Sequence, residues 1–455
     1  MAFRDTRQRI DPTCPKACRL SAVSSLTFAE ADAELVSCLI AKNWTRAEVI
    51  IRGVVNTISY QFAGKCEMRQ YHDIPDKPER KAHPVVYLPI EIKSREWDAK
   101  LLIADLLAEA GLNVVLGQSW AVQKGKYHGW PPGIILFKTM NAFDGVNMRG
   151  AIANGHLIAA IDEEAFARAA QADLVRLYTD QWAIACADVI CLQGPDHARV
   201  FAEVYPRAKD KLVVTGNPRA DVRPEFTKPP ASPGYALLCC MSGNINNTRG
   251  FSTCTYSTMM LSAQADLELA RKIYLEQVLH ELRILPLFLE TINRLLSEYS
   301  QVIIRPHPVE GHEYWQHMLS GQDRANITNQ DSVQSWIKHA GHVVVVEHCG
   351  CAVEAKLLGV EPETISLERH KNQFITDGHM PPGRSAPRVV EAIKNLYAAH
   401  KTSDPLPELA HRKSGFVAKA FHRNKFPVTS LGEVQTALPK RNVYEVEENV
   451  FLVRP

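Results

Sequence analysis

The chain has 455 residues, 46% of them hydrophobic and 22% charged, and its formal net charge is +2 at pH 7. This is the composition of a soluble globular protein with two or three domains. The near-neutral charge gives no argument for nucleic acid or an acidic membrane as a partner. No apolar run of about 18 residues is present, so no membrane-spanning helix is predicted.

The first residues and the cysteines indicate a cytoplasmic protein. Residues 1–9 are polar and lack the apolar core of a secretion signal. In a long chain without such a signal, 11 cysteines favour reduced thiols. Their spacing forms no paired C-x-x-C motif, so we expect neither a structural metal nor a cofactor.

Residues 1–80 form an N-terminal extension to which the sequence assigns no role, and its end, 73–80, has the charges and prolines of a linker. A first domain, 81–216, then alternates short apolar strands with helices at 98–110 and 166–177. This alternation predicts a parallel sheet with helices on both faces. The expected strands are 85–89, 113–116, 133–137, 156–161, 188–192 and 212–215.

A proline-rich segment, 217–234, predicts a restricted hinge, with prolines at 218, 224, 229, 230 and 233. The α/β pattern restarts in a second domain, 235–400. Its long helical stretch, 266–299, is expected to break near Pro286. Its expected strands are 235–240, 302–305, 342–347 and 364–366, and a last helix covers 388–399. The sequence predicts no definite structure for the tail, 401–455, which could pack back on the first domain.

The predicted fold class is therefore α/β, with two doubly wound Rossmann-like domains facing a central cleft. Ligands of such proteins usually bind in the cleft. Neither a P-loop nor a G-x-S-x-G elbow is present, which argues against P-loop and serine hydrolase chemistry.

Arg305-Pro306-His307-Pro308, at the end of an apolar strand, is a candidate anion site. Arginine can bind phosphate through two hydrogen bonds, and histidine can donate to a phosphate or leaving oxygen. The prolines fix φ and stiffen the loop. The alternative is a rigid turn with an exposed histidine.

The stretch 347–354 follows the next long apolar strand and is a second candidate. Gly350 permits close approach of a ligand, and a helix starting near Cys351 directs amides toward it. Glu354 could accept hydrogen bonds from a ribose or merely complement the helix dipole. Cys349 and Cys351 are better explained as packing residues than as nucleophiles. Ser332 could touch phosphate but fits an ordinary helix cap equally well.

Three further stretches sit where the cleft should be. Asp162-Glu163-Glu164 could supply a nucleophile or a general base, or simply an acidic first helical turn. The segments 215–219 and 242–244 have the composition of turns. The alternating charges of residues 89–96 suit a solvated loop, although they could also reach an acceptor or a sugar.

Together these motifs resemble the bacterial surface carbohydrate biosynthesis protein family over about residues 85–400. The resemblance rests on the order of five motifs, which is more specific than any one of them. They are Tyr87-Leu88-Pro89-Ile90-Glu91-Ile92-Lys93-Ser94-Arg95-Glu96-Trp97-Asp98-Ala99-Lys100, Ile161-Asp162-Glu163-Glu164, Thr215-Gly216-Asn217-Pro218-Arg219, Arg305-Pro306-His307-Pro308 and the region of Glu354. The family implies a GT-B glycosyltransferase with a nucleotide-sugar in the cleft.

The His-Pro pair is also similar to that of transferases for Kdo and related ulosonic acids, which use CMP donors. That resemblance implies Asp162 as the nucleophile, with Glu163 second, and His307 at the CMP phosphate. From their expected position at the cleft, Glu91, Lys93, Arg95 and Glu96 are the candidates for contact with the acceptor or sugar. The candidate donor-binding residues are Arg305, Pro308, Ser332, His348, Gly350, Cys351, Glu354, Ser242, Asn244 and Asn217, of which the resemblance places Glu354 at the ribose.

The chain departs from the family in two places. Residues 1–80 have no counterpart, and His348-Cys349-Gly350-Cys351 replaces an Asn-Ser-Thr-like run, which leaves fewer hydroxyl donors. The expected activity is transfer of a sugar to a glycan, lipid-linked or protein acceptor, without metal or nucleic acid. Peripheral membrane contact through the basic stretch 411–425 is left open. The alternatives are a CDP-alditol phosphotransferase, a GT-B-fold epimerase and a non-catalytic sugar-binding scaffold.

Overall fold

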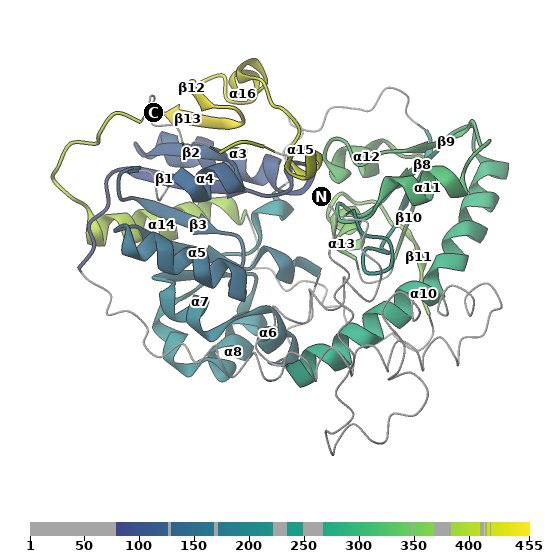
Figure 1. Ribbon diagram of the computed structural model, residues 1–455, viewed down its shortest axis with the longest axis horizontal. Coiled ribbons are helices and arrows are strands. Elements are labelled where there is room, and N and C mark those ends of the chain that lie inside the picture. Colours follow the sequence, from purple (N-terminus) through teal and green to yellow (C-terminus); the bar gives the residue numbers. More distant parts are fainter. Residues whose placement is uncertain are drawn as a thin grey trace, which may run out of the picture.

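The computed structural model shows two α/β domains side by side, each built on a mainly parallel sheet (Figure 1). The N-terminal extension up to residue 78 and most of the proline-rich hinge lie outside the described residues. The structure describes residues 79–125, 129–167, 172–221, 234–248, 267–346, 349–367, 384–409, 414, 416–418 and 420–455.

The first sheet has the strand order β12-β13-β2-β1-β3-β4-β5-β6. Alternate residues of β1 enter opposite cores: Val86 and Leu88 pack with α3, while Val85 and Tyr87 pack on the other face. The expected strands are present, and both faces of the sheet are covered. Its parallel strands are β1 (Val85–Ile90), β2 (Asn113–Gln118), β3 (Ile134–Phe137), β4 (Leu157–Ile161), β5 (Val189–Leu192) and β6 (Leu212–Val214). The helices are α3 (Lys93–Glu109), α4 (Ser119–Gly125), α5 (Ala142–Ala153), α6 (Ala172–Tyr178), α7 (Gln181–Cys186) and α8 (Pro195–Val204).

The second sheet is parallel and has the order β11-β10-β7-β8-β9. Numbered along the chain, this is the 3-2-1-4-5 order of a nucleotide-binding Rossmann sheet, and its direction reverses between β7 and β10. The predicted α/β fold class, with two Rossmann-like domains in a GT-B-like arrangement, is confirmed. The strands are β7 (Ala236–Cys239), β8 (Val302–Arg305), β9 (Ala325–Ile327), β10 (His342–Val346) and β11 (Glu363–Ile365).

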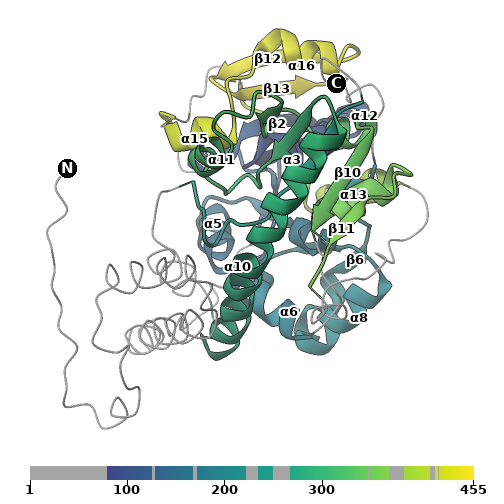
Figure 2. The same ribbon diagram turned by 90° about the vertical axis from the view of Figure 1, so that its right-hand side faces the viewer.

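Helix α10 (Leu267–Glu298) continues through Pro286, so the expected break is wrong. Proline removes one backbone hydrogen bond, but Ile284 and Phe288 on either side are fully buried against the second sheet. Figure 2 shows α10 extending toward α6 of the first domain, where Gln277 Nε2 donates to the Tyr178 hydroxyl at 3.1 Å. Helices α12 (Val333–His339) and α13 (Gly350–Leu357) cover the other face, and α11 (His312–Met318) lies beside α10.

The C-terminal part of the chain lies on the first domain. Helix α14 (Ala386–His400), which the sequence placed in the second domain, buries Val389 and Ile393 in the core around α3. Strands β12 (Asn442–Glu447) and β13 (Val450–Arg454) pair antiparallel, and β13 extends the first sheet next to β2. Helices α15 (Ala420–Lys425) and α16 (Leu431–Ala437) precede this hairpin. None of the helices within the described ranges could cross a bilayer.

Asp221 links the two segments of the chain that cross between the domains. Its carboxylate accepts hydrogen bonds from the backbone amides of Ser385 at 2.8 Å and Ala386 at 2.7 Å, which caps α14. Just before it, the 3-10 turn η4 (Pro218–Ala220) is closed by Asn217, whose side-chain oxygen accepts from the Arg219 amide. The outgoing and returning segments are therefore held together at the hinge.

Candidate site between the two domains

A pocket, here called the cleft pocket, lies between the domains at the carboxyl ends of β7, β8 and β10. The first domain contributes Ser94 and Arg95 from the start of α3, and Arg219 from the hinge. The remaining lining comes from the second domain, at the point where its sheet reverses direction. Open α/β sheets bind ligands at this position. Those lining residues are Cys239, Cys240, Met241, Arg305, Pro306, His307, Pro308, Asn329, Val333, Cys349, Gly350, Cys351 and Glu354.

Arg305 mainly holds the neighbouring loop, 329–331, in place through hydrogen bonds to its backbone. Its guanidinium donates to the backbone carbonyls of Gln330 at 2.6 Å, Asp331 at 2.5 Å and Asn329 at 3.4 Å. Asp331 adopts φ 59°, an unusual conformation for a non-glycine residue. Burial lowers the pKa of Arg305. Arg305 lines the pocket with Pro308, but its role as a phosphate ligand stays a prediction.

His307 is a half-buried hydrogen-bond donor at the pocket. Its Nδ1 accepts from the Val309 amide at 3.4 Å, which places the proton of the neutral ring on Nε2. Burial, followed by the positive charge of Arg95, lowers the pKa of His307 to about 4. At neutral pH the imidazole is therefore uncharged and can donate from Nε2.

Glu310, which sequence reasoning missed, fixes the histidine loop. The side chain is fully buried and accepts from the amides of Ser242 at 2.8 Å and His307 at 3.1 Å. It also accepts from the Ser242 hydroxyl at 2.6 Å and from Trp315 Nε1 at 3.0 Å. These four bonds tie the loop after β7 to the loop after β8.

Ser242 and Asn244 are consequently occupied by internal contacts and do not line the cleft pocket. Glu281 of α10 accepts from the Asn244 amide at 2.8 Å and from its side-chain nitrogen at 2.6 Å. Burial and then the nearby charge of Glu310 raise the pKa of Glu281 to about 8. A Cβ at Gly243 would lie 2.4 Å from Val309, so a glycine is needed where the two loops touch.

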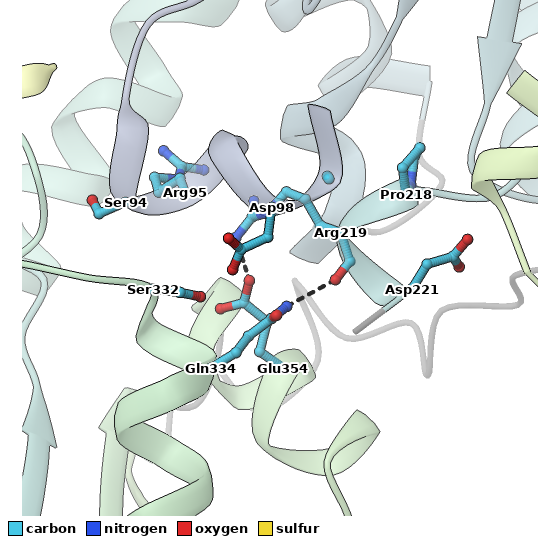
Figure 3. Close-up of a pocket in the computed structure, with 10 residues that line it drawn as sticks. Ser94, Arg95, Asp98, Pro218, Arg219, Asp221, Ser332, Gln334 and Glu354 are labelled. Carbon is cyan, nitrogen blue, oxygen red and sulfur yellow. Dashed lines mark hydrogen bonds and ion pairs between the residues drawn. The ribbon is translucent and has the colours of Figure 1, made fainter. Parts of the chain in front are cut away.

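Glu354 bridges the domains. Its Oε1 lies 2.6 Å from Nη2 of Arg219, and both side chains are buried. Its Oε2 is buried and has no hydrogen-bond partner in the described part of the chain. Burial raises the pKa of Glu354, while Arg219 opposes the shift. Figure 3 shows this pair beside Gln334, whose side-chain nitrogen donates to the Arg219 carbonyl at 2.8 Å.

A smaller pocket, here called the hinge pocket, adjoins the cleft pocket and shares Ser94, Arg95, Arg219 and Glu354 with it. Figure 3 shows Asp98 and Ser332 facing each other across this pocket. Ser332 makes no side-chain cap to α12 and lies instead beside Asp98 of the first domain in the lining of the hinge pocket. Burial raises the pKa of Asp98 to about 6. Ser332 thus lies at the domain interface.

The carboxylates after β4 lie at different distances from the pocket lining. Asp162 is buried, accepts from the Ala165 amide at 3.2 Å and has His197 Nε2 at 3.6 Å. Glu163 forms a buried ion pair with Lys100 at 2.5 Å. Neither lines a described pocket. Their catalytic roles stay predictions.

Glu164, the third carboxylate of this turn, is more exposed and lies 3.5 Å from the pocket-lining Arg95. Its turn, η2 (Glu163–Ala167), packs against α13 of the second domain. The negative charge of Glu164 raises the pKa of Arg95 above its ordinary range. Glu164 is therefore the carboxylate of the cluster that is connected to the cleft pocket.

The expected acceptor residues separate into two groups, because residues 93–96 are the first turn of α3. Arg95 lines the cleft pocket, whereas Glu96 accepts from the backbone amides of Glu91 and Ile92 at 2.9 and 3.1 Å. Lys93 pairs with Glu433 of α16 at 2.6 Å, away from the pocket.

Glu91 belongs to a cluster of charged residues that does not line the cleft pocket. Lys138 lies 2.5 Å from Glu91 and 3.3 Å from Glu96, and Lys425 also pairs with Glu91. Although burial opposes the shift, the ammonium groups of Lys138 and Lys425 hold the pKa of Glu91 at about 2.

The remaining predicted donor-binding residues lie in different places. Asn217 donates to the Glu163 carbonyl at 3.4 Å and supports the hinge. Gly350 and Cys351 lie at the pocket, and His348 is outside the described residues.

No family model and no curated protein matches the chain. Similar solved structures include S. aureus MnaA with UDP, 11% identical over 71% of this chain and 92% of that one, with a TM-score of 0.38. The wall teichoic acid polymerase TagF with CDPG is 9% identical over 88% of this chain and 97% of that one, with a TM-score of 0.34. Accessory secretory proteins 1, 2 and 3 of Streptococcus pneumoniae are 11% identical over 67% of this chain and 51% of that one, with a TM-score of 0.26. These likenesses are too distant to indicate a function for this chain.

Proposed function

We propose that this chain is a glycosyltransferase that moves a sugar from a nucleotide donor to a surface glycan or its precursor. The finer form of the proposal has a CMP-linked ulosonic acid as donor and a glycan, lipid-linked or protein acceptor. The observation that carries it is the cleft pocket, which lies at the sheet reversal of a Rossmann-like domain and faces a second α/β domain.

The second-domain side of the pocket has donors suited to a phosphate. Helix α13 begins at Gly350, and its N-cap residue, Cys349, provides no side-chain hydrogen bond to the helix. Amides of a first helical turn favour anions through their hydrogen atoms and the helix dipole. His307 adds its Nε2 proton from the neighbouring strand end. These groups would stabilise the negative charge that develops on a leaving nucleotide.

Glu354 supports the placement of a ribose beside that phosphate. Its buried Oε2 has no described partner, and the carboxylate lies one turn into α13 from Gly350. A ribose hydroxyl would supply the missing donor. Because Oε1 already pairs with Arg219, such a ligand would contact a group shared by both domains.

The first-domain side supplies the groups for the sugar and the acceptor. Arg95 lines the pocket and lies next to Glu164. Asp162 and Glu163 remain the nucleophile or base candidates implied by the family resemblance, and Glu164 joins them on its connection to Arg95. A carboxylate on this side would act on the face of the sugar opposite the leaving phosphate.

A thermal-shift panel with CMP, CDP, UDP and GDP tests the proposal. A ligand at about 100 times its Kd stabilises the folded state by about 2.7 kcal/mol, so a true donor nucleotide raises the Tm. CMP should give the largest rise. His307→Ala should reduce it, whereas the matched control His317→Ala, an exposed histidine of the same domain, should not.

The other outcomes separate the alternatives. Stabilisation by CDP without CMP favours the alditol phosphotransferase, and stabilisation by UDP alone contradicts the CMP donor. No response to any of the four nucleotides contradicts the nucleotide-donor proposal and favours the scaffold. Donor hydrolysis measured on Asp162→Asn, Glu163→Gln and Glu164→Gln then assigns the carboxylate.

A further inference from the structure

Four cysteines line the cleft pocket: Cys239, Cys240, Cys349 and Cys351. The first pair ends β7, and the second pair lies at the start of α13, more than a hundred positions later in the sequence. The fold brings them together because β7 and β10 are adjacent at the sheet reversal. The proposed transferase chemistry uses none of these thiols.

Three of the four cysteines, Cys239, Cys349 and Cys351, lie close enough together in the pocket lining for their side chains to interact. The neighbouring Cys239 and Cys349 thiols, followed by the positive charge of Arg305, hold the pKa of Cys351 well below its ordinary range. The N-terminal end of α13 acts in the same direction. Cys351 is therefore the cysteine of this cluster best suited to react as a thiolate.

Access to the cluster is uneven. Cys351 and Cys349 are partly exposed at the pocket, while Cys239 and Cys240 are buried. Within the described ranges, no group of three or more His, Cys, Asp or Glu side chains has an arrangement that could hold a metal ion. The structure thus favours thiol chemistry at Cys351, which a small molecule can reach through the pocket.

We propose that this cluster is a thiol-modification site, at which a peroxide oxidises Cys351 and Cys239 then forms a disulfide with it. In the first step the Cys351 sulfur attacks the peroxide, an S–O bond forms, the O–O bond breaks and hydroxide leaves. In the second step the Cys239 sulfur attacks Cys351, an S–S bond forms and the S–O bond breaks. The Cys239 proton leaves with that oxygen as water. Overall, the two cysteines lose two electrons and two protons, one of them the proton that Cys351 gives up on forming its thiolate, and hydrogen peroxide becomes two molecules of water.

The product has a defined structural effect. The disulfide ties the end of β7 to the first turn of α13 and removes the thiolate charge from the pocket. Both elements line the place where a ligand would bind, so oxidation changes the lining of the pocket. Cys240 lines the same pocket, but its pKa is raised by burial, and it serves as a matched control.

The test treats the full-length chain with hydrogen peroxide and maps the cysteines by mass spectrometry without reduction. Wild type and Cys240→Ala should yield a linked Cys239–Cys351 peptide. Cys239→Ala should accumulate sulfenic acid at Cys351, detected as its dimedone adduct, and Cys351→Ala should show neither product. Melting curves of the reduced variants establish that each is folded.

A second measurement stays decisive if a variant does not fold. In the wild type, iodoacetamide should alkylate Cys351 at least about ten times faster at pH 7 than an ordinary thiol with a pKa of about 8.5. Slow alkylation of Cys351, or oxidation that spares Cys351 while other cysteines react, overturns the proposal. A Cys349–Cys351 disulfide in place of Cys239–Cys351 overturns the assignment of the second thiol. Neither measurement uses a nucleotide, so the result is independent of the proposed function.

Discussion

Two carboxylates on each side of the cleft are satisfied in different ways. On the first-domain side, buried Glu163 and half-buried Glu91 form ion pairs with lysines, Glu163 with Lys100 and Glu91 with Lys138. On the second-domain side Glu310 and Glu281 accept hydrogen bonds from backbone amides and neutral side chains of the loops after β7 and β8. One side therefore balances its charges internally, while the other fixes loops whose remaining donors face the pocket.

The largest expected effect comes from breaking the buried ion pair. Lys100→Ala leaves the Glu163 carboxylate buried without its partner at 2.5 Å, which should cost about 3–5 kcal/mol of unfolding free energy. Urea unfolding measures the loss. The control Lys93→Ala removes a more exposed pair with Glu433 and should cost at most about 1 kcal/mol. Equal losses in the two variants would mean that burial does not distinguish these pairs.

The second effect tests the hydrogen-bonded side. Glu310→Ala removes the acceptor for Ser242, His307 and Trp315, and each buried donor left unpaired costs about 1–3 kcal/mol, less whatever water recovers. We expect a net loss of about 2–3 kcal/mol and weaker nucleotide binding, because the histidine loop loses its support. Glu310→Gln keeps one acceptor oxygen and should lose less. A stable Glu310→Ala protein with unchanged nucleotide binding would contradict the positioning role.

A smaller effect is expected at the hinge, where the two sides are joined. Asp221→Ala removes the cap from the amides of Ser385 and Ala386 and should cost about 1 kcal/mol. The measurement is the Tm of Asp221→Ala compared with that of the control Asp404→Ala, which changes an exposed aspartate in the segment that returns to the first domain. If Asp221→Ala matches its control, the cap does not stabilise the hinge.

The sequence predicted the parts of this molecule that are encoded locally. Apolar runs placed the strands, and the rule that ligands bind at strand ends placed His307 and Gly350 at one pocket. The second-domain assignment of residues 388–399 was wrong, because no local pattern marks a chain that crosses back to another core.

Long-range partners were also beyond local reasoning. Glu354 pairs with Arg219, 135 positions away, and Glu310 collects donors from the loop of Ser242, 68 positions away. A single acidic residue carries no sign of which distant amide it will meet. The family resemblance ranked Glu163 second to Asp162 as the nucleophile, and only the fold shows that Lys100 pairs with it.

The most direct test of the nucleotide site is the titration of His307 followed by NMR of labelled histidine, with His307→Ala for assignment. Without ligand the pKa should be about 4, because burial and Arg95 disfavour the charged ring. A bound CMP phosphate is an adjacent negative charge, so saturating CMP should raise the pKa of His307. A His307 pKa that stays near 4 at saturating CMP would contradict the phosphate site at the cleft pocket.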